Sequence, residues 1–153
     1  ITELYMTRLL NLAREKMEKG ESCPKVLVVV EEAHTVMPET GSMGVGDFES
    51  KGLVGKISQV ALQGRKYGVG LLVLAQRTAN VSKTVLTQCN TVISFSGYDD
   101  TSLNFLKNIY GPIVTETIPN LRTRQAVVFG KAVRSERPVV VDIPYDPKKD
   151  SSS

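Results

Sequence analysis

Two adjacent carboxylates follow one of the most apolar stretches of the chain. Glu31 and Glu32 come directly after residues 26–30 (VLVVV). Such a run of β-branched residues is typical of a strand buried in a parallel sheet, and ligands of these sheets bind at the carboxyl ends of the strands. Buried carboxylates need compensation. A magnesium ion and a water that attacks a phosphate would supply it, one acid helping to hold the metal and the other polarising the water.

Blander interpretations of these residues stay open. Glu31 and Glu32 can simply cap the following loop or helix, and His34 can be an ordinary loop histidine. A divalent-metal hydrolase is a third interpretation, in which Asp47 joins these three side chains as a ligand. It predicts metal binding by this chain and activity without a nucleotide.

Two further polar residues flank a second apolar run, at 71–75 (LLVLA). Gln76 leaves this run at its carboxyl end, so its amide is expected near the two acids, where it can sense a phosphate or orient a water. Arg65 precedes the run, in a turn that should point away from its own site. Its permanently charged planar head suits a phosphate in a neighbouring subunit, as an arginine finger. The alternative is a solvated Arg-Lys pair that interacts favourably with a helix end.

Helices and strands alternate along most of the chain. Residues 2–19 predict an amphipathic helix that ends at Gly20, with its apolar stripe on Tyr5, Leu9, Leu12, Ala13 and Met17. Residues 35–49 predict a long loop, and 50–64 a second helix. Short helices are expected at 83–88 and from Asp99 or Asp100 to Ile109, strands at 26–30, 71–75 and 91–95, and terminal strands at 124–129 and 137–143. This order predicts an α/β fold with a parallel sheet, flanking helices and terminal β-strands.

Composition narrows the class of protein. The 153 residues carry a formal net charge of +3, which is too mild to indicate nucleic-acid binding by itself. The two cysteines and the single histidine form no metal-binding spacing. No segment has the pattern of a signal peptide, and the run at 26–30 is far too short to span a bilayer. We therefore expect a soluble, cytoplasmic protein without a membrane segment.

Several short motifs, taken in order, resemble the carboxyl-terminal half of HerA/FtsK-type P-loop motor ATPases. They are 31–34 (EEAH), 64–70 (GRKYGVG), 75–77 (AQR) and 86–91 (LTQCNT). Residues 119–121, 127–130 and 139–141 also fit the closing strands of that family. The resemblance runs from about residue 2 to 144.

This resemblance implies a partial RecA-like fold, with ATP and Mg²⁺ as cofactors. It implies that Glu31 serves the magnesium ion, probably the wrong word for a direct ligand since water would stand between them, and that Glu32 is the catalytic base. Gln76 would be the sensor of the nucleotide and Arg65 the finger that acts in trans. It further implies a hexameric ring that translocates on double-stranded DNA, with a nuclease of the NurA type as a partner.

The phosphate-binding motif of such ATPases is absent from the sequence. Residues 52–58 (GLVGKIS) look similar, but Ile57 stands where Ser or Thr must follow the lysine, and Ser50 where the first glycine should be. We therefore expect residues 1–144 to be the carboxyl-terminal part of an ATPase domain, followed by a polar tail at 145–153. A fragment of this kind is expected to be inactive alone.

Two other functions share part of this pattern. The ATPase of a conjugation or type IV secretion system carries the same motifs but moves protein or single-stranded DNA. A non-catalytic module that only oligomerises or docks a partner predicts that Glu32→Gln leaves ATP turnover unchanged in the full-length protein.

Overall fold

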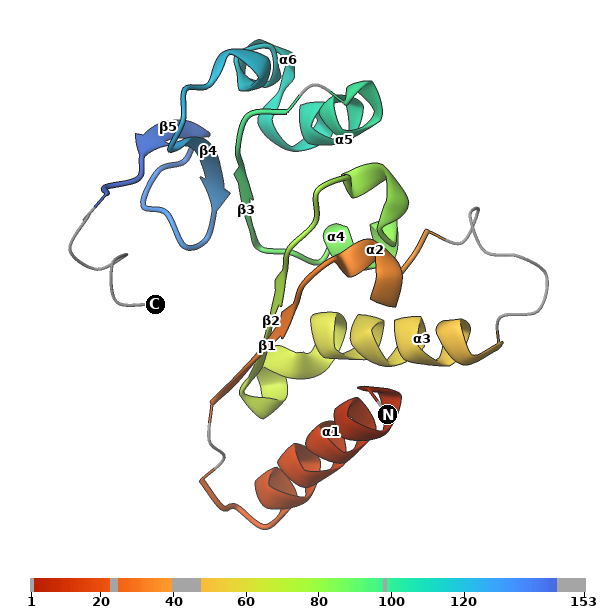
Figure 1. Cartoon of the computed structure of the whole chain (residues 1–153). Coiled ribbons are helices and arrows are strands. Elements are labelled where there is room, and N and C mark those ends of the chain that lie inside the picture. Colours follow the sequence, from red (N-terminus) through yellow and green to blue (C-terminus); the bar gives the residue numbers. More distant parts are fainter. Residues whose placement is uncertain (1, 23–24, 40–47, 98, 146–153) are drawn as a thin grey trace. The chain divides into compact units, whose positions relative to one another are not determined.

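The computed structural model describes residues 2–22, 25–39, 48–97 and 99–145 (Figure 1). They form two compact units, Ile1–Cys89 and Asn90–Ser153. The loop expected at 35–49 is described only at its ends, and the tail only at Tyr145. A single domain over residues 1–144 stays a prediction.

The first unit has the predicted parallel α/β arrangement. Strand β1 (Val26–Val30) pairs in parallel with β2 (Val69–Val73), in a register that aligns Val30 with Val73. Helix α1 (Thr2–Glu18) precedes β1, and α3 (Phe48–Gln63) lies beside α1 on the way to β2 (Figure 1). Strand β2 therefore begins two residues earlier than the sequence predicts.

The core of this unit lies between the two helices and one face of the sheet. Its fully buried side chains on α3 are Ile57 and Val60, which belong to the predicted apolar stripe of that helix. On α1 the prediction was wrong: Tyr5 is 72% exposed, and the residues that enter the core are Met6, Leu10 and Ala13. This helix carries apolar residues on more than one side, so two stripes satisfy the same helical period.

The opposite face of the β1–β2 sheet is not covered by the described residues. Leu27, Val29 and Leu72 are 62%, 49% and 43% exposed. The register places all three on one face, because side chains alternate along each strand. The prediction of strands buried on both faces is therefore wrong for this chain as described, and only one face is buried.

Tight turns lead into and out of the two strands. A 3₁₀ turn, η2 (Gly64–Tyr67), joins α3 to β2. A Cβ at Gly64 would stand 2.4 Å from the carbonyl oxygen of Val69, so only glycine lets this turn approach the start of β2. Beyond the strands lie three short elements that the sequence does not announce clearly: α2 (Ala33–Val36), η3 (Thr78–Asn80) and α4 (Lys83–Leu86).

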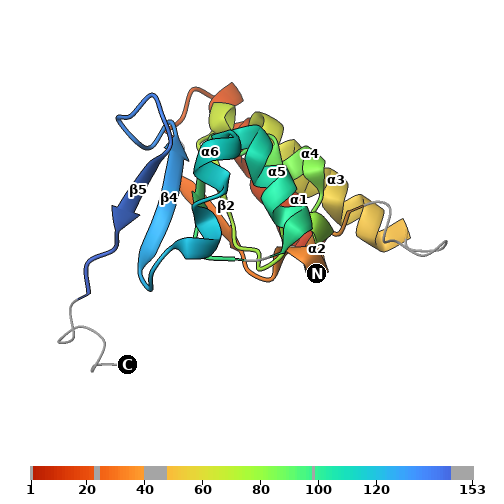
Figure 2. The ribbon, with the colours of Figure 1, turned by 90° about the horizontal axis from the view of Figure 1, so that it is seen from above.

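The second unit is an antiparallel sheet with helices. Strand β3 (Thr91–Ser94) pairs antiparallel with β4 (Gln125–Gly130), which pairs antiparallel with β5 (Val139–Asp142). Figure 2 shows β4 and β5 side by side. The terminal strands are confirmed, whereas β3, expected in the parallel sheet, has its described partner in β4. Helices α5 (Asp100–Tyr110) and α6 (Pro112–Thr115) and the turn η4 (Ile118–Asn120) connect β3 to β4.

A buried tyrosine links the helices of this unit to its sheet. The Tyr110 hydroxyl lies 2.9 Å from Oγ of Ser94 and donates to the carbonyl oxygen of Val127 over 3.4 Å. Leu106 and Ile118 complete the core around it. Asp99 caps α5 as predicted, because its carboxylate accepts from the amide of Ser102 over 2.9 Å.

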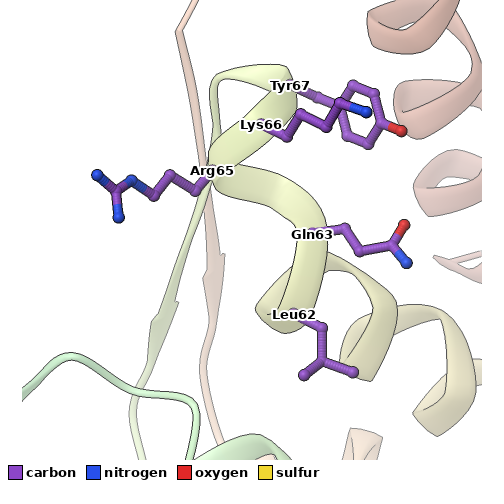
Figure 3. A pocket seen from close by; sticks show the side chains of 5 residues that line it. All are labelled: Leu62, Gln63, Arg65, Lys66 and Tyr67. Carbon is purple, nitrogen blue, oxygen red and sulfur yellow. The ribbon is translucent and has the colours of Figure 1, made fainter.

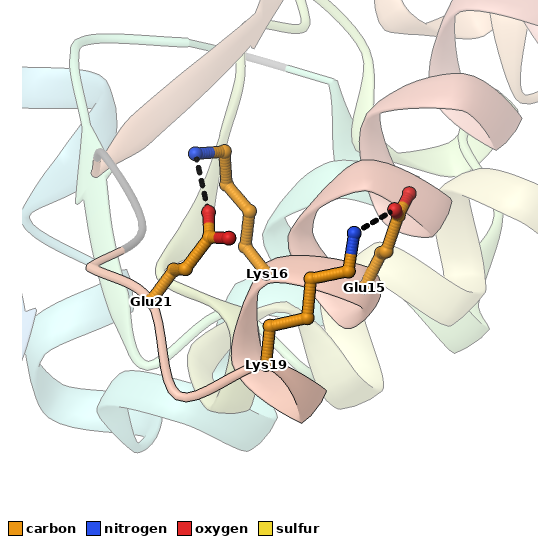
Figure 4. A network of polar contacts seen from close by, with 4 residues as sticks. All are labelled: Glu15, Lys16, Lys19 and Glu21. Atoms are coloured by element: carbon orange, nitrogen blue, oxygen red, sulfur yellow. Dashed lines mark hydrogen bonds and ion pairs between the residues drawn. The ribbon is translucent and has the colours of Figure 1, made fainter.

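The end of α1 is held by two surface ion pairs. Lys19 donates to Glu15 over 2.6 Å, and Lys16 to Glu21 over 3.2 Å (Figure 4). The Lys19 ammonium lowers the pKa of the Glu15 carboxyl through this hydrogen bond and through its charge. Exposed pairs of this kind add little to stability. Among the described residues, no helix is long and apolar enough to cross a membrane.

Candidate active site

Two of the predicted site residues meet at the carboxyl ends of β1 and β2. The side-chain amide of Gln76 donates to Oε1 of Glu32 over 3.0 Å. The parallel register explains the meeting: Val30 aligns with Val73, so the chain segments that leave the two strands remain neighbours. The amide of Leu74 donates to the carbonyl oxygen of Val30, and this bond extends the pairing beyond the end of β2.

The backbone of Glu32 has a rare conformation. Its φ and ψ are 47° and 49°, in the left-handed region that costs an L-residue about 1–2 kcal/mol. Three hydrogen bonds hold it: Thr35 donates to the Glu32 carbonyl from both its amide and its hydroxyl, and the amide of Ala33 donates to the carbonyl of Leu74. Strain of this kind is common at functional sites, where the surroundings over-determine one geometry.

The segments that follow the two strands are fastened to each other. The amide of Ser82 donates to the carbonyl of Met37, and Pro38 forms a β-bridge with Val81. Met37 and Val81 are fully buried. The site therefore rests on a packed support, although it is built from turns.

A carboxylate completes this support. Oε2 of Glu39 accepts from the backbone amide of Lys83, the first residue of α4, over 2.8 Å. An acid here satisfies one of the free amides at a helix start. The sequence analysis missed this role because Glu39 precedes Lys83 by 44 positions.

The single histidine also contacts the candidate base. Nδ1 of His34 lies 3.5 Å from Oε2 of Glu32, and the His34 side chain is half-buried. The sequence left His34 open between a functional residue and an ordinary loop histidine. Thr35, which holds the Glu32 carbonyl, was not singled out at all, since a threonine after EEAH carries no distinctive signal.

Glu31 stands apart from this cluster. Its side chain is exposed and makes no hydrogen bond or ion pair with another described residue. Glu32 is also exposed, with 53% of its side chain accessible. The expectation that the two carboxylates are buried is therefore wrong for the described structure, and the cost of burial cannot be the argument for a metal.

The donor set still fits one side of a magnesium site. Mg²⁺ prefers oxygen ligands, keeps several waters and is usually bound through one or two carboxylates together with substrate phosphates. Glu31 offers free carboxylate oxygens at the edge where Glu32 and Gln76 meet. No cluster of three His, Cys, Asp or Glu exists among the described residues, so the site of a metal-only hydrolase is not assembled in that part of the chain. Asp47, its fourth member, lies outside the described residues.

Arg65 lies at the other end of the sheet from Glu32. It belongs to η2, before the amino end of β2, whereas Glu32 follows the carboxyl end of the parallel strand β1. A strand of five residues at about 3.3 Å each separates these ends by roughly 16 Å. Arg65 therefore cannot reach its own Glu32.

The surroundings of Arg65 leave its head group free. Figure 3 shows Arg65 pointing to the side opposite Lys66 and Tyr67, along a shallow hollow that these residues line with Leu62 and Gln63. Lys66 and Arg14 both stand over the Tyr67 ring, 5.7 and 5.9 Å from its centroid. Arg65 itself makes no hydrogen bond or ion pair within the described part of the chain.

Comparison with curated proteins gives helicases. The chain is 28% identical over 148 residues to the DNA double-strand break repair helicase HerA of Sulfurisphaera tokodaii, covering 93% of this chain and 28% of that protein. It is 31% identical over 120 residues to the probable DNA double-strand break repair helicase HerA of Methanocaldococcus jannaschii, covering 76% and 22%. The chain thus spans less than a third of these relatives. No family model matches it.

Solved structures agree on the fold. The genome packaging NTPase B204 of Sulfolobus turreted icosahedral virus 2, in complex with ATP-γ-S, aligns with a TM-score of 0.64 at 15% identity, over 92% of this chain and 62% of that one. The conjugation coupling protein TcpA of pCW3 aligns with a TM-score of 0.68 at 16% identity, over 97% and 45%. The predicted fold class, a partial RecA-like arrangement of the P-loop NTPases, is confirmed.

Proposed function

We propose, from the premise that this chain is HerA-like and has the fold of a P-loop motor ATPase, that it supplies the catalytic carboxylate half of an ATP-hydrolysing core. The phosphate-binding loop of that core would come from a segment outside this sequence. The chain alone is then expected to bind nucleotide poorly and to hydrolyse it hardly at all.

The observation that carries this proposal is the pair formed by Glu32 and Gln76. A carboxylate and an amide from neighbouring parallel strands meet at 3.0 Å on the edge where ligands of such sheets bind. The strained backbone of Glu32 supports the same interpretation, since a mere surface acid needs no left-handed conformation.

The chemistry assigned to these residues is proton abstraction from water. Oε1 or Oε2 of Glu32 would take a proton from the water that attacks the terminal phosphate of ATP, and the amide of Gln76 would orient that water. Arg65, which cannot reach its own Glu32, would offset the charge that develops on the phosphate in a neighbouring subunit. A catalytic pair and a trans-acting arginine together require an oligomer.

Glu31 would hold the metal ion through water. Bound Mg²⁺ supplies charge neutralisation on the phosphates during transfer. The exposed Glu31 carboxylate, one residue before Glu32, provides the hard oxygen ligands that this ion prefers.

The wider function follows from the relatives. The two HerA proteins are described as DNA double-strand break repair helicases. We propose that the protein to which this chain belongs forms a hexameric ring, moves along double-stranded DNA with ATP hydrolysis and works in the cytoplasm. A nuclease of the NurA type is the partner that the resemblance implies.

The test is ATP hydrolysis by the full-length protein with Mg²⁺, with and without double-stranded DNA. Glu32→Gln is expected to lower kcat by about 100-fold or more, the range of general acid–base catalysis, with nucleotide affinity retained. Glu116→Gln, which changes an exposed acid at the end of α6, is the matched control and should keep wild-type turnover. Unchanged turnover in Glu32→Gln would favour a non-catalytic module.

The choice of translocated substrate is a separate arm of the same assay. Stimulation by double-stranded DNA supports the HerA-like function. Stimulation by single-stranded DNA alone would favour a conjugation-type ATPase, whose fold this chain also shares.

A further inference from the structure

The carboxylate of Glu32 is held from both sides. Oε1 accepts from Gln76, which lies beyond β2, and Oε2 lies 3.5 Å from Nδ1 of His34, in the helical turn that follows Glu32 itself. The two contacts come from different elements and use different oxygens. Together they leave the side chain one orientation, although 53% of it is accessible to solvent.

The contact with His34 depends on the unusual backbone at Glu32. Side chains two positions apart on a regular helix do not face each other. Glu32 is the left-handed residue before α2, so it stands outside the phase of the helix that carries His34. Thr35 locks this arrangement by donating twice to the Glu32 carbonyl. The strain thus has a consequence, which is to bring Nδ1 of His34 to the carboxylate.

We propose that His34 is a positioning residue for Glu32 and acts through Nδ1. This inference rests on the proposed function, in which Glu32 is the base. A free glutamate side chain samples many rotamers, and fixing one costs conformational entropy at each turnover. His34 fixes the orientation of Oε2 before substrate binds, so that Oε1 stays next to Gln76. His34 itself touches neither water nor phosphate in this arrangement.

The geometry distinguishes Nδ1 from the rest of the ring. The side-chain nitrogen of asparagine lies as many bonds from Cα as Nδ1 of histidine, whereas that of glutamine lies one bond further out. His34→Asn therefore keeps a donor where Nδ1 stands, and His34→Gln moves it. His34→Phe keeps a ring of similar shape without any donor.

The experiment measures ATP turnover and nucleotide affinity of the full-length protein for these three variants, with Glu32→Gln in parallel. His34→Gln and His34→Phe are expected to lower kcat about 10-fold, inside the range that a misplacement of about 1 Å can cost, with nucleotide affinity unchanged. His34→Asn is expected to restore most of the loss. Thermal unfolding of each variant checks that the fold is intact.

The outcomes separate the two proposals. If Glu32→Gln is inactive and all three His34 variants turn over like the wild type, His34 does not position the base. Equal losses in His34→Asn and His34→Phe would also overturn the assignment, since the ring rather than Nδ1 would then matter, as would a loss of nucleotide affinity in place of kcat. If Glu32→Gln itself is fully active, the proposed function fails instead.

Discussion

The amide of Gln76 and the carboxylate of Glu32 meet at 3.0 Å, although 44 positions separate them in the chain. Their contact exists because β1 and β2 run parallel and in register, so both residues leave the sheet at one edge. The carboxylate oxygen that accepts from Gln76 is one that a catalytic water would need. In the structure as it stands, the pair thus fixes the base in place before any substrate arrives.

Changing Gln76 tests this pairing. In the full-length protein, Gln76→Ala removes the donor, and Gln76→Glu puts a second negative charge against Glu32. We expect ATP turnover to fall in both, and further in Gln76→Glu, because like charges about 3 Å apart repel strongly. Steady-state hydrolysis measures it. Gln88→Glu, the same change at an exposed position, should have no effect, and equal activity in all three variants would contradict the pairing.

The position of Arg65 predicts a distinctive result in mixed oligomers. Arg65→Ala and Glu32→Gln should each be nearly inactive alone. If Arg65 acts in trans, mixing the two variants places an intact Arg65 beside an intact Glu32 at some subunit interfaces, and turnover partly returns. If both residues serve the same subunit, no complete site forms and mixing restores nothing.

Two controls accompany the mixing experiment. Lys66→Ala removes the neighbouring cation, which stands over the Tyr67 ring rather than free, and should keep most of the turnover. Arg65→Lys keeps the charge but not the planar head and should recover only part of it. Full activity of Arg65→Ala alone would show that the arginine is only a solvated residue at a helix end.

How much of this site the sequence predicts depends on the range of the interaction. The carboxyl edge of two parallel strands follows from apolar runs and the order of elements, so Glu32 and Gln76 are expected to lie close together. The left-handed backbone at Glu32 is not, because glutamate gives no local signal for it. The contact with His34 was equally hidden, since it depends on that backbone.

Burial was harder to predict than position. The run at 26–30 has no polar alternation, so the sequence cannot say that Leu27 and Val29 are left exposed by the described residues. On α1, the same helical period allows a stripe through Tyr5 or one through Met6, and packing against α3 selects the second. Periodicity defines the element, whereas the partner decides which face is buried.

Tyr110 predicts a loss of stability at alkaline pH. Burial raises the pKa of its hydroxyl, and the weaker effect of the Ser94 hydrogen bond lowers it. The unfolded chain therefore loses this proton first, near pH 10. The stabilisation is complete below that pH and is lost as the pH rises through the higher folded pKa. Denaturant unfolding of this chain between about pH 8 and 11 measures the effect.

Variants isolate the contribution of Tyr110 from other groups that titrate in this range. Tyr110→Phe should cost about 1 kcal/mol at pH 8, through the lost hydrogen bond, and should depend less on pH above 10 than the wild type. Tyr5→Phe changes a tyrosine that is 72% exposed and should follow the wild type throughout. Parallel curves for wild type and Tyr110→Phe would contradict the prediction.

The strain at Glu32 predicts that function and stability oppose each other at this residue. Glycine adopts φ near 47° freely, whereas alanine does not. Both Glu32→Gly and Glu32→Ala remove the carboxylate and its contacts with Gln76 and His34, so their difference reports the backbone alone. Glu32→Gly should be more stable to urea than Glu32→Ala by about 1 kcal/mol. Equal stabilities would mean that the left-handed conformation relaxes once the side chain is gone, and that Thr35 does not hold it.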